Sequence, residues 1–356
     1  MTTYTYQTID PPGSTYTIAN SINSNGQIVG LFYDSNHVEH GFLDNNGIYT
    51  TIDPPGSVYT DATDINSLGQ IVGVYNTAGV GGLGFLDSKG TYTTIAPPGS
   101  INGNLYINKA GQIVGTYRDS YGVDHGFLYS NGAYTTLNYP GGIDTYALSI
   151  NDGGQVAGDY QDSNGIEHGF FYSHGTYTTI DPSGSIETSI TSINKFGVIA
   201  GWFASSGHQQ GFEYSHGAYT ILNFPGAVNT VPLSINDKGQ VTGYYETTTS
   251  MYGFTYSQGQ YTTINPPGSL GTLDWSINNS GQVVGFYEDS TTNHGFVATD
   301  PPSPTSAPHQ DLTAATLQLV QAMASFSPTG SVFNASPFNQ MTDNVTQLGN
   351  HLAQPH

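Results

Sequence analysis

Short runs of mostly apolar residues, separated by polar residues, recur along the first 300 residues, and most of them end at a turn that contains glycine. Segments such as Gln27–Tyr33 (QIVGLFY) and His125–Tyr129 (HGFLY) carry the β-branched and aromatic residues that favour strands. Pairs such as Asn131-Gly132 separate neighbouring runs and supply the positive φ that tight hairpins need. The pattern therefore predicts an all-β chain of short antiparallel strands.

The runs belong to a repeat with the motif I-N-x-x-G-(Q)-(I/V)-x-G. A P-x-G or P-G turn precedes each copy and a G-F pair follows it. The motif occurs seven times at spacings of 42 or 43 residues, with its asparagines at Asn23, Asn66, Asn108, Asn151, Asn194, Asn236 and Asn278. Four short strands in about 42 residues is the size of one propeller blade. The sequence thus predicts a seven-bladed β-propeller over residues 1–300, with four antiparallel strands per blade.

The two ends of the repeat indicate how the ring closes. The seventh unit lacks a fourth strand, whereas the chain begins with a fourth strand and its turn, residues 4–9 followed by Asp10-Pro11-Pro12-Gly13. We expect residues 4–9 to complete the last blade, because closure removes exposed strand edges. The alternative is an open solenoid with an orphan strand at each end.

Composition changes after residue 300. Residues 301–310 are rich in proline and serine and predict an extended linker. Residues 311–356 contain apolar positions at helical spacing, so we expect a helical C-terminal tail. This tail would pack on the propeller or mediate self-association.

Charge and composition exclude several classes of partner. Five Lys and Arg face 26 Asp and Glu, giving a formal net charge of −21, which disfavours nucleic acid. No apolar run is long enough for membrane insertion. Cysteine is absent, which excludes disulfides and thiolate metal sites. The N-terminus has no signal-peptide pattern, yet acidic, glycine-rich chains without cysteine are common among secreted bacterial proteins.

We name the four strands of each unit A to D in chain order. Function is expected on the face that carries the B–C and D–A connections, here called the loop face. Its loops vary between units and are rich in Asp and Glu, whereas Lys89, Lys109, Lys195 and Lys238 fall on the opposite, tight-turn face. Strand A of each unit starts at the loop face beside the central channel. We expect ligand contacts at this channel mouth from Tyr16, Tyr59, Asp61, Asp144, Tyr146, Glu187, Asn229, Asp274 and Trp275. The alternative is a solvated rim whose residues vary freely.

Two further sets of residues have weaker patterns. Loop carboxylates among glycines suit Ca²⁺, a hard cation, so Asp34, Asp119, Asp162 and Asp289 are candidate metal ligands. No organic cofactor is expected. His40, His125, His168 and His294 open strand C at equivalent points of four units. Their equivalence places them apart around the ring, so we expect each to tie its B–C loop to a neighbouring blade.

The units I-N-x-x-G-Q-I-V-G-x-Y and H-G-F-L-Y resemble those of the bacterial extracellular H-A-F repeat family, named for a His-Ala-Phe triplet. The triplet here is His-Gly-Phe at four positions, and Leu83, Gln210 or Tyr252 replaces the histidine in the others. The resemblance covers residues 4–299 and implies an extracellular bacterial setting. It transfers no catalytic residue.

The sequence leaves three functions open. The first is a secreted binding propeller that recognises a glycan or cell-surface polymer through its acidic loop face. The second is a polysaccharide lyase or glycoside hydrolase centred at the channel mouth, because propeller enzymes assemble unmotifed residues from separate blades. The third is a scaffold that assembles with protein partners through the C-terminal helix.

Overall fold

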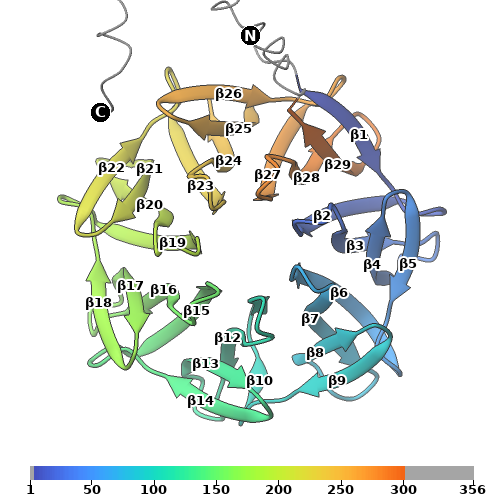
Figure 1. Ribbon diagram of the computed structural model, residues 1–356, viewed down its shortest axis with the longest axis horizontal. Coiled ribbons are helices and arrows are strands. Elements are labelled where there is room, and N and C mark those ends of the chain that lie inside the picture. The colour runs from blue at the N-terminus through green and yellow to red at the C-terminus, as the bar shows by residue number, and fades with distance from the viewer. Residues whose placement is uncertain (1–3, 301–356) are drawn as a thin grey trace, which may run out of the picture. The chain divides into compact units, whose positions relative to one another are not determined.

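Seven antiparallel sheets surround a central channel in the computed structural model, which describes residues 4–300 (Figure 1). Each sheet is one blade, with strand A innermost and strand D at the perimeter. No helix that could cross a membrane is found among residues 4–300. The predicted linker, 301–310, and helical tail, 311–356, lie outside the described residues. The predicted seven-bladed propeller with four strands per blade is confirmed.

The strands follow the repeat closely. Strand A of blades 1 to 7 is β2 (Tyr16–Ile22), β6 (Ser57–Ile65), β10 (Ser100–Ile101) with β11 (Tyr106–Ile107), β15 (Asp144–Ile150), β19 (Glu187–Ile193), β23 (Asn229–Ile235) and β27 (Gly271–Ile277). Strand B is β3 (Ile28–Tyr33), β7 (Gln70–Thr77), β12 (Ile113–Arg118), β16 (Val156–Gln161), β20 (Ile199–Ser205), β24 (Val241–Glu246) and β28 (Val283–Glu288). Strand C is β4 (Glu39–Asn45), β8 (Leu83–Ser88), β13 (Asp124–Ser130), β17 (Glu167–Ser173), β21 (His208–Ser215), β25 (Met251–Ser257) and β29 (Asn293–Thr299). Strand D is β5 (Ile48–Ile52), β9 (Thr91–Ile95), β14 (Ala133–Leu137), β18 (Thr176–Ile180), β22 (Ala218–Leu222), β26 (Gln260–Ile264) and, for blade 7, β1 (Thr5–Ile9).

The N-terminal strand closes the ring. β1 pairs antiparallel with β29, in a register that runs from Thr5 opposite Thr299 to Ile9 opposite Gly295 (Figure 1). Ile9 is wholly buried, as are the isoleucines and leucines that end strand D of the other blades. The closure expected from the two ends of the repeat is therefore confirmed.

The hydrophobic core is divided among the blades. Each strand C contributes one wholly buried phenylalanine, from the G-F pair of the repeat: Phe42, Phe85, Phe127, Phe170, Phe212, Phe254 and Phe296. Burying one such side chain contributes about 1.5–3 kcal/mol relative to leaving it in water. The core thus repeats in register with the sequence, and each blade needs its neighbours to cover it.

Two rings of hydrogen bonds join neighbouring blades. At the tight-turn end of the channel, the side-chain amide of each motif asparagine donates to the backbone carbonyl of the motif asparagine in the next blade, at 2.9–3.1 Å. At the perimeter, strand-D tyrosines accept backbone N–H groups of the preceding blade, as Tyr134 does from Ala96 and Tyr6 from Asn265. The asparagine ring explains why the motif keeps an asparagine in every unit.

Strand A carries a β-bulge in six of the seven blades, between the fourth and second residues before the motif asparagine. The glycine of strand B permits this bulge. A Cβ on Gly30 would lie 2.0 Å from the carbonyl oxygen of Ile18, and one on Gly158 would lie 2.0 Å from that of Tyr146. Only glycine allows so close an approach of strand A. The bulge turns one extra side chain of each strand A toward the channel.

Blade 3 departs from the pattern. Its strand A breaks into β10 and β11, joined by residues 102–105, because Asn102-Gly103 turns the chain with a φ of 102° at Gly103. The core is kept by Leu105, which is wholly buried and contacts the position of Gly115. This break places Asn104 at the channel instead of a regular bulge residue.

Candidate functional site

The bulge residues meet inside the channel. They line a cavity of about 260 Å³ together with Asn104 and Tyr106 of blade 3 and Ser189 of blade 5. The bulge residues are Asn20, Thr63, Leu148, Thr191, Leu233 and Trp275. β-Bulges often re-aim a side chain next to a functional site. Because every blade contributes at least one residue, the cavity can be chemically different on every side while the scaffold remains a repeat.

The cavity wall mixes apolar and polar side chains. Trp275 of blade 7 is 38% exposed, an unusual exposure for an indole within a channel, and Leu233 of the adjacent blade 6 lines the same wall. Blades 1 and 3 contribute the amides of Asn20 and Asn104. An aromatic face beside a few placed hydrogen-bonding groups is typical of small-molecule sites. The volume is just below the roughly 300–1,000 Å³ of drug-sized pockets, so it suits one small ring of a larger ligand.

The residues predicted at the channel mouth lie along the seams between blades. Tyr16 accepts a hydrogen bond from Asn293 of blade 7, Asp144 accepts the backbone N–H of Asp124, and Asn229 accepts that of Gln209. Glu187 opens β19 at the equivalent place. These residues therefore hold strand A of one blade against strand C of the preceding blade. Of the predicted set, Trp275 alone lines the cavity directly.

The seam between blades 1 and 2, here called seam 1–2, contains a cluster of two carboxylates and two phenols. Tyr33 donates to Glu39 Oε2 at 2.5 Å, and Asn20 Nδ2 donates to Asp61 Oδ1 at 2.7 Å. Tyr59 lies against both carboxylates. Burial, together with the charge of Glu39, raises the pKa of Asp61 to about 7. Asn20 thus connects this cluster to the cavity, which it also lines.

Seam 3–4 has a similar pair with its own counter-ion. Arg118 binds Asp124 through Nε–Oδ1 at 2.9 Å and Nη2–Oδ2 at 2.5 Å, and Tyr146 donates to the same carboxylate. Burial by itself raises the pKa of Asp124, but hydrogen bonds from Arg118 and Asn102 outweigh burial and lower it. The bidentate geometry is the strong form of this ion pair.

Asp274, expected at the mouth, instead lies between blades 6 and 7. Its side chain is wholly buried, and its carboxylate occupies the space in which a Cβ on Gly253 would stand. Oδ2 accepts a hydrogen bond from Thr242, whereas Oδ1 has no partner among the described residues. Asp274 precedes the bulge residue, at the position that Ala19, Ala62 and Ala147 occupy in the core of other blades. The expectation that Asp274 contacts ligand at the channel mouth is therefore wrong, because its side chain points into the core.

The four candidate metal ligands lie on four different blades. Each folds its own B–C loop: Asp34 Oδ1 accepts the N–H groups of Asn36 and Val38, and Asp162 Oδ1 those of Asn164 and Ile166. Such bonds hold the pKa of Asp34, Asp119 and Asp162 below the ordinary value and that of Asp289, bound by Thr291, at about 2. Within residues 4–300, no group of three or more His, Asp or Glu side chains has the geometry to hold a metal ion.

The four equivalent histidines make structural contacts. His168 Nδ1 lies 2.7 Å from Asp181, the residue that follows strand D of the same blade, while Nε2 faces Asp162 of the B–C loop at 3.8 Å. His40 and His294 repeat this arrangement. Each histidine thus ties its B–C loop to the exit of strand D in its own blade, and the tie we expected to a neighbouring blade is not the one formed.

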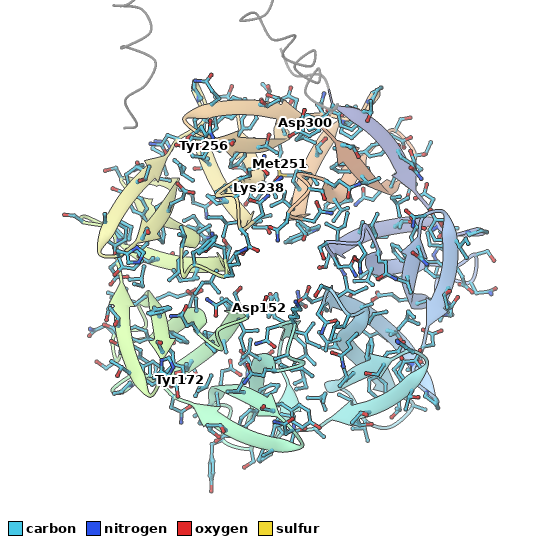
Figure 2. The ribbon with its side chains drawn as sticks, in the orientation of Figure 1. Asp152, Tyr172, Lys238, Met251, Tyr256 and Asp300 are labelled. Atoms are coloured by element: carbon cyan, nitrogen blue, oxygen red, sulfur yellow. The ribbon has the colours of Figure 1, made fainter. Side chains whose placement is uncertain are left out.

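The motif asparagines surround the other end of the channel. A polar cavity of about 230 Å³ is lined there by the motif asparagines and the residues that follow them, including Asp152 and Lys195. Figure 2 shows the side chain of Asp152 at the edge of the open channel. Lys195 pairs with Asp237 at 3.4 Å, and its backbone N–H binds the same residue. The polar groups here bind one another around the ring.

Comparison with known proteins supports the fold. No protein-family model and no curated protein matches the sequence. The propeller domain of the Trilobed protease from Pyrococcus furiosus is similar at a TM-score of 0.59 and 10% identity, over 79% of this chain and 95% of that one. Streptogramin B lyase is similar at a TM-score of 0.54 and 12% identity, over 83% of this chain and 98% of that one. A fucose-binding lectin from Aleuria aurantia aligns at a TM-score of 0.44 and 13% identity, over 83% of this chain and 100% of that one. The chain is a β-propeller. The protease domain is described as having an open velcro topology, whereas β1 closes the present ring.

Sequence reasoning did not identify the bulge residues as a set that faces the channel. Counting back from the motif asparagine identified the seam residues seven positions earlier, but the residues that face the channel lie three positions before it. The signal was present in the glycine of strand B, whose recurrence in all seven units marks a close backbone approach.

Proposed function

We propose that this protein is a binding propeller whose channel cavity takes one ring of a glycan or other hydroxylated cell-surface polymer. The observation that supports the proposal is Trp275, held by its bulge in the channel wall with 38% of its surface exposed. An exposed indole provides a flat apolar face for a sugar ring, and Asn20, Asn104 and Ser189 provide hydrogen bonds to hydroxyl groups. The ligand enters from the loop face, which carries the variable B–C loops.

The setting that fits this function is extracellular. Polymers of the cell surface are met there, and the resemblance to the H-A-F repeats points to the same place. Ca²⁺ at Asp34, Asp119, Asp162 and Asp289 stays a prediction from the sequence, which the experiment below tests by adding and omitting Ca²⁺.

A glycan array tests the proposal. Labelled protein is applied with and without Ca²⁺, as wild type and as Trp275→Ala. Phe196→Ala is a matched control, since Phe196 is an aromatic residue 62% exposed in the A–B turn of blade 5, on the tight-turn face. We expect wild type and the control to bind the same glycans and Trp275→Ala to lose them. Binding to no glycan, or equal binding by all three proteins, would reject the proposal.

A second candidate is cleavage of the bound glycan. Asp61 favours it, because a carboxyl group with a pKa near 7 beside a second carboxylate can transfer protons at neutral pH. New reducing ends released from polysaccharides by the wild type, and lost in Asp61→Asn, would establish an enzyme. A complete absence of products from every polysaccharide that binds would leave a binding protein.

A further inference from the structure

Equivalent cross-strand pairs lie at the loop-face ends of strands B and C. In blade 1 Tyr33 of β3 pairs with Glu39 of β4, and in blade 3 Arg118 of β12 pairs with Asp124 of β13. Both acidic residues are buried, at 6% and 2% exposure, and both face strand A of the following blade. The repeat presents an acidic residue at this position in three blades, since Glu167 of β17 pairs with Gln161 of β16 in blade 4. Blades 1 and 3 place it in two different electrostatic environments.

In blade 3 a side chain of the same blade, Arg118, provides a cation at this position. The guanidinium of Arg118 neutralises Asp124 in a bidentate ion pair. A buried carboxylate that is paired and fully hydrogen-bonded avoids most of the cost of leaving water. Seam 3–4 is thus electrostatically complete.

Blade 1 has no such cation. Tyr33 gives Glu39 a neutral phenol in place of the guanidinium, and a second phenol, that of Tyr59, lies against the same carboxylate. Glu39 Oε1 is buried and has no hydrogen bond within 3.5 Å among the described residues. Asp61 adds a second carboxylate beside it. Within residues 4–300, neither Glu39 nor Asp61 forms an ion pair. A buried carboxylate oxygen without a partner is costly, so the cluster is incomplete without a ligand.

We infer that Glu39 and Asp61 form a subsite for a protonated primary amine, and that the preferred ligand of the channel is an amino sugar. This inference rests on the proposed function, because the sugar ring would occupy the adjacent cavity. Asn20 joins the two places: it donates to Asp61 and lines the cavity. An ammonium group has three donors, which match the free oxygen of Glu39 and the carboxylate of Asp61.

Protonation in the cluster is consistent with a missing cation. Burial and the charge of Glu39 raise the pKa of Asp61 to about 7, and burial also raises the pKa of Glu39. The other titratable groups that face the pair are the phenols of Tyr33 on β3, Tyr59 on β6 and Tyr106 on β11, all with pKa raised and therefore uncharged at neutral pH. A bound ammonium would take the place of the proton that Asp61 holds.

Calorimetric titration with oligosaccharides of equal length tests the inference. The probes are oligomers of glucosamine, of N-acetylglucosamine and of glucose, at pH 6.5. We expect the wild type to bind the glucosamine oligomer at least about tenfold more tightly than the other two, as for a charge-assisted hydrogen bond. Glu39→Gln with Asp61→Asn should remove this preference and leave the affinity for the neutral oligomers.

Two further variants control for misfolding and for general charge. Tyr33→Arg copies blade 3 and places a guanidinium on Glu39, so it should abolish the preference while the fold is kept. Asp144→Asn removes one charge from seam 3–4, where Arg118 is already present, and should leave the preference unchanged.

The outcomes separate this inference from the proposed function. Equal affinity for the three oligomers would overturn the inference and leave glycan binding intact. Loss of the preference in Asp144→Asn, or its persistence in both Tyr33→Arg and the double variant, would also overturn it. Oligolysine that binds as tightly as the glucosamine oligomer would show that a basic peptide, and not an amino sugar, is the ligand. If no oligosaccharide binds, the proposed function itself fails.

Discussion

The side-chain amide of Asn278 donates to the backbone carbonyl of Asn23 at 3.0 Å, although the two residues lie 255 positions apart in the chain. This bond is the last of the seven that link the motif asparagines into a ring. The same side chain binds Gln282 and accepts the N–H of Ser280, so it holds its own A–B turn while it contacts the next blade. One residue type therefore stabilises both the turn and the ring.

Replacing one motif asparagine should destabilise the whole propeller. Asn151→Ala removes bonds to Asn194 and Gln155 and leaves buried polar groups without partners. We expect a loss of about 3 kcal/mol in the free energy of unfolding, measured by urea denaturation. The control, Thr135→Ala on the exposed surface of β14, should change stability by less than about 0.5 kcal/mol. Similar values for the two variants would contradict the role of the ring.

The strand that closes the ring, β1, should contribute to stability as much as the asparagine ring does. Deleting residues 1–9 removes β1, exposes the edge of β29 and uncovers the core around Phe296. We expect the melting temperature to fall by about 10 °C or more and the protein to aggregate through the open edge. Differential scanning calorimetry gives the melting temperature. A deletion variant with the same melting temperature as the full chain would show that closure is not needed for stability.

The strand-B glycine should not tolerate a side chain. In Gly158→Ala the new Cβ would lie 2.0 Å from the carbonyl oxygen of Tyr146, so strand A must shift. We expect destabilisation of about 3 kcal/mol, the upper end for an overpacked site, and loss of ligand affinity, because the bulge positions Leu148 in the cavity wall. Gly79→Ala, in the B–C loop of blade 2 with open space around it and no positive φ, is a control that should be mild. An unchanged crystal structure of blade 4 in Gly158→Ala would contradict this account.

Removing the buried carboxylate of Asp274 should stabilise the protein. Alanine occupies the equivalent place in three blades, as Ala19, Ala62 and Ala147, and Thr242 keeps its bond to Phe254. We expect Asp274→Ala to gain about 1–3 kcal/mol at pH 7, since Oδ1 has no partner and burial raises the pKa of Asp274 well above the ordinary value.

Stability should also depend on pH. Burial raises the folded-state pKa of Asp61, Asp159 and Asp274 above the unfolded value near 3.9, so the folded protein holds more protons than the unfolded one between these values. Stability is therefore lost as the pH rises through the folded-state pKa values. The melting temperature should be higher at pH 5 than at pH 8, and the difference should shrink in Asp274→Ala. A melting temperature that rises toward pH 8 would contradict the assignment.

The fold could be predicted from the sequence because each unit repeats its turns, its Phe and its Asn. The site could not be predicted to the same degree, for two physical reasons. A β-bulge shifts the side-chain alternation by one residue, so Asp274 lies in the core and its neighbour Trp275 in the channel. Contacts across a seam, such as that of Tyr59 with Glu39, depend on which blades are neighbours and on the register between them, which no single unit reveals.

The central claim is that the bulge residues form a saccharide site around Trp275. The chain has two tryptophans, so Trp202→Phe leaves Trp275 as the sole indole reporter. Its fluorescence is titrated with the glucosamine, N-acetylglucosamine and glucose oligomers and with each glycan that the array identifies. We predict a saturable change in the emission of Trp275, with the affinity that calorimetry gives for the wild type. A glycan that binds at that affinity while the emission of Trp275 stays constant would contradict the claim.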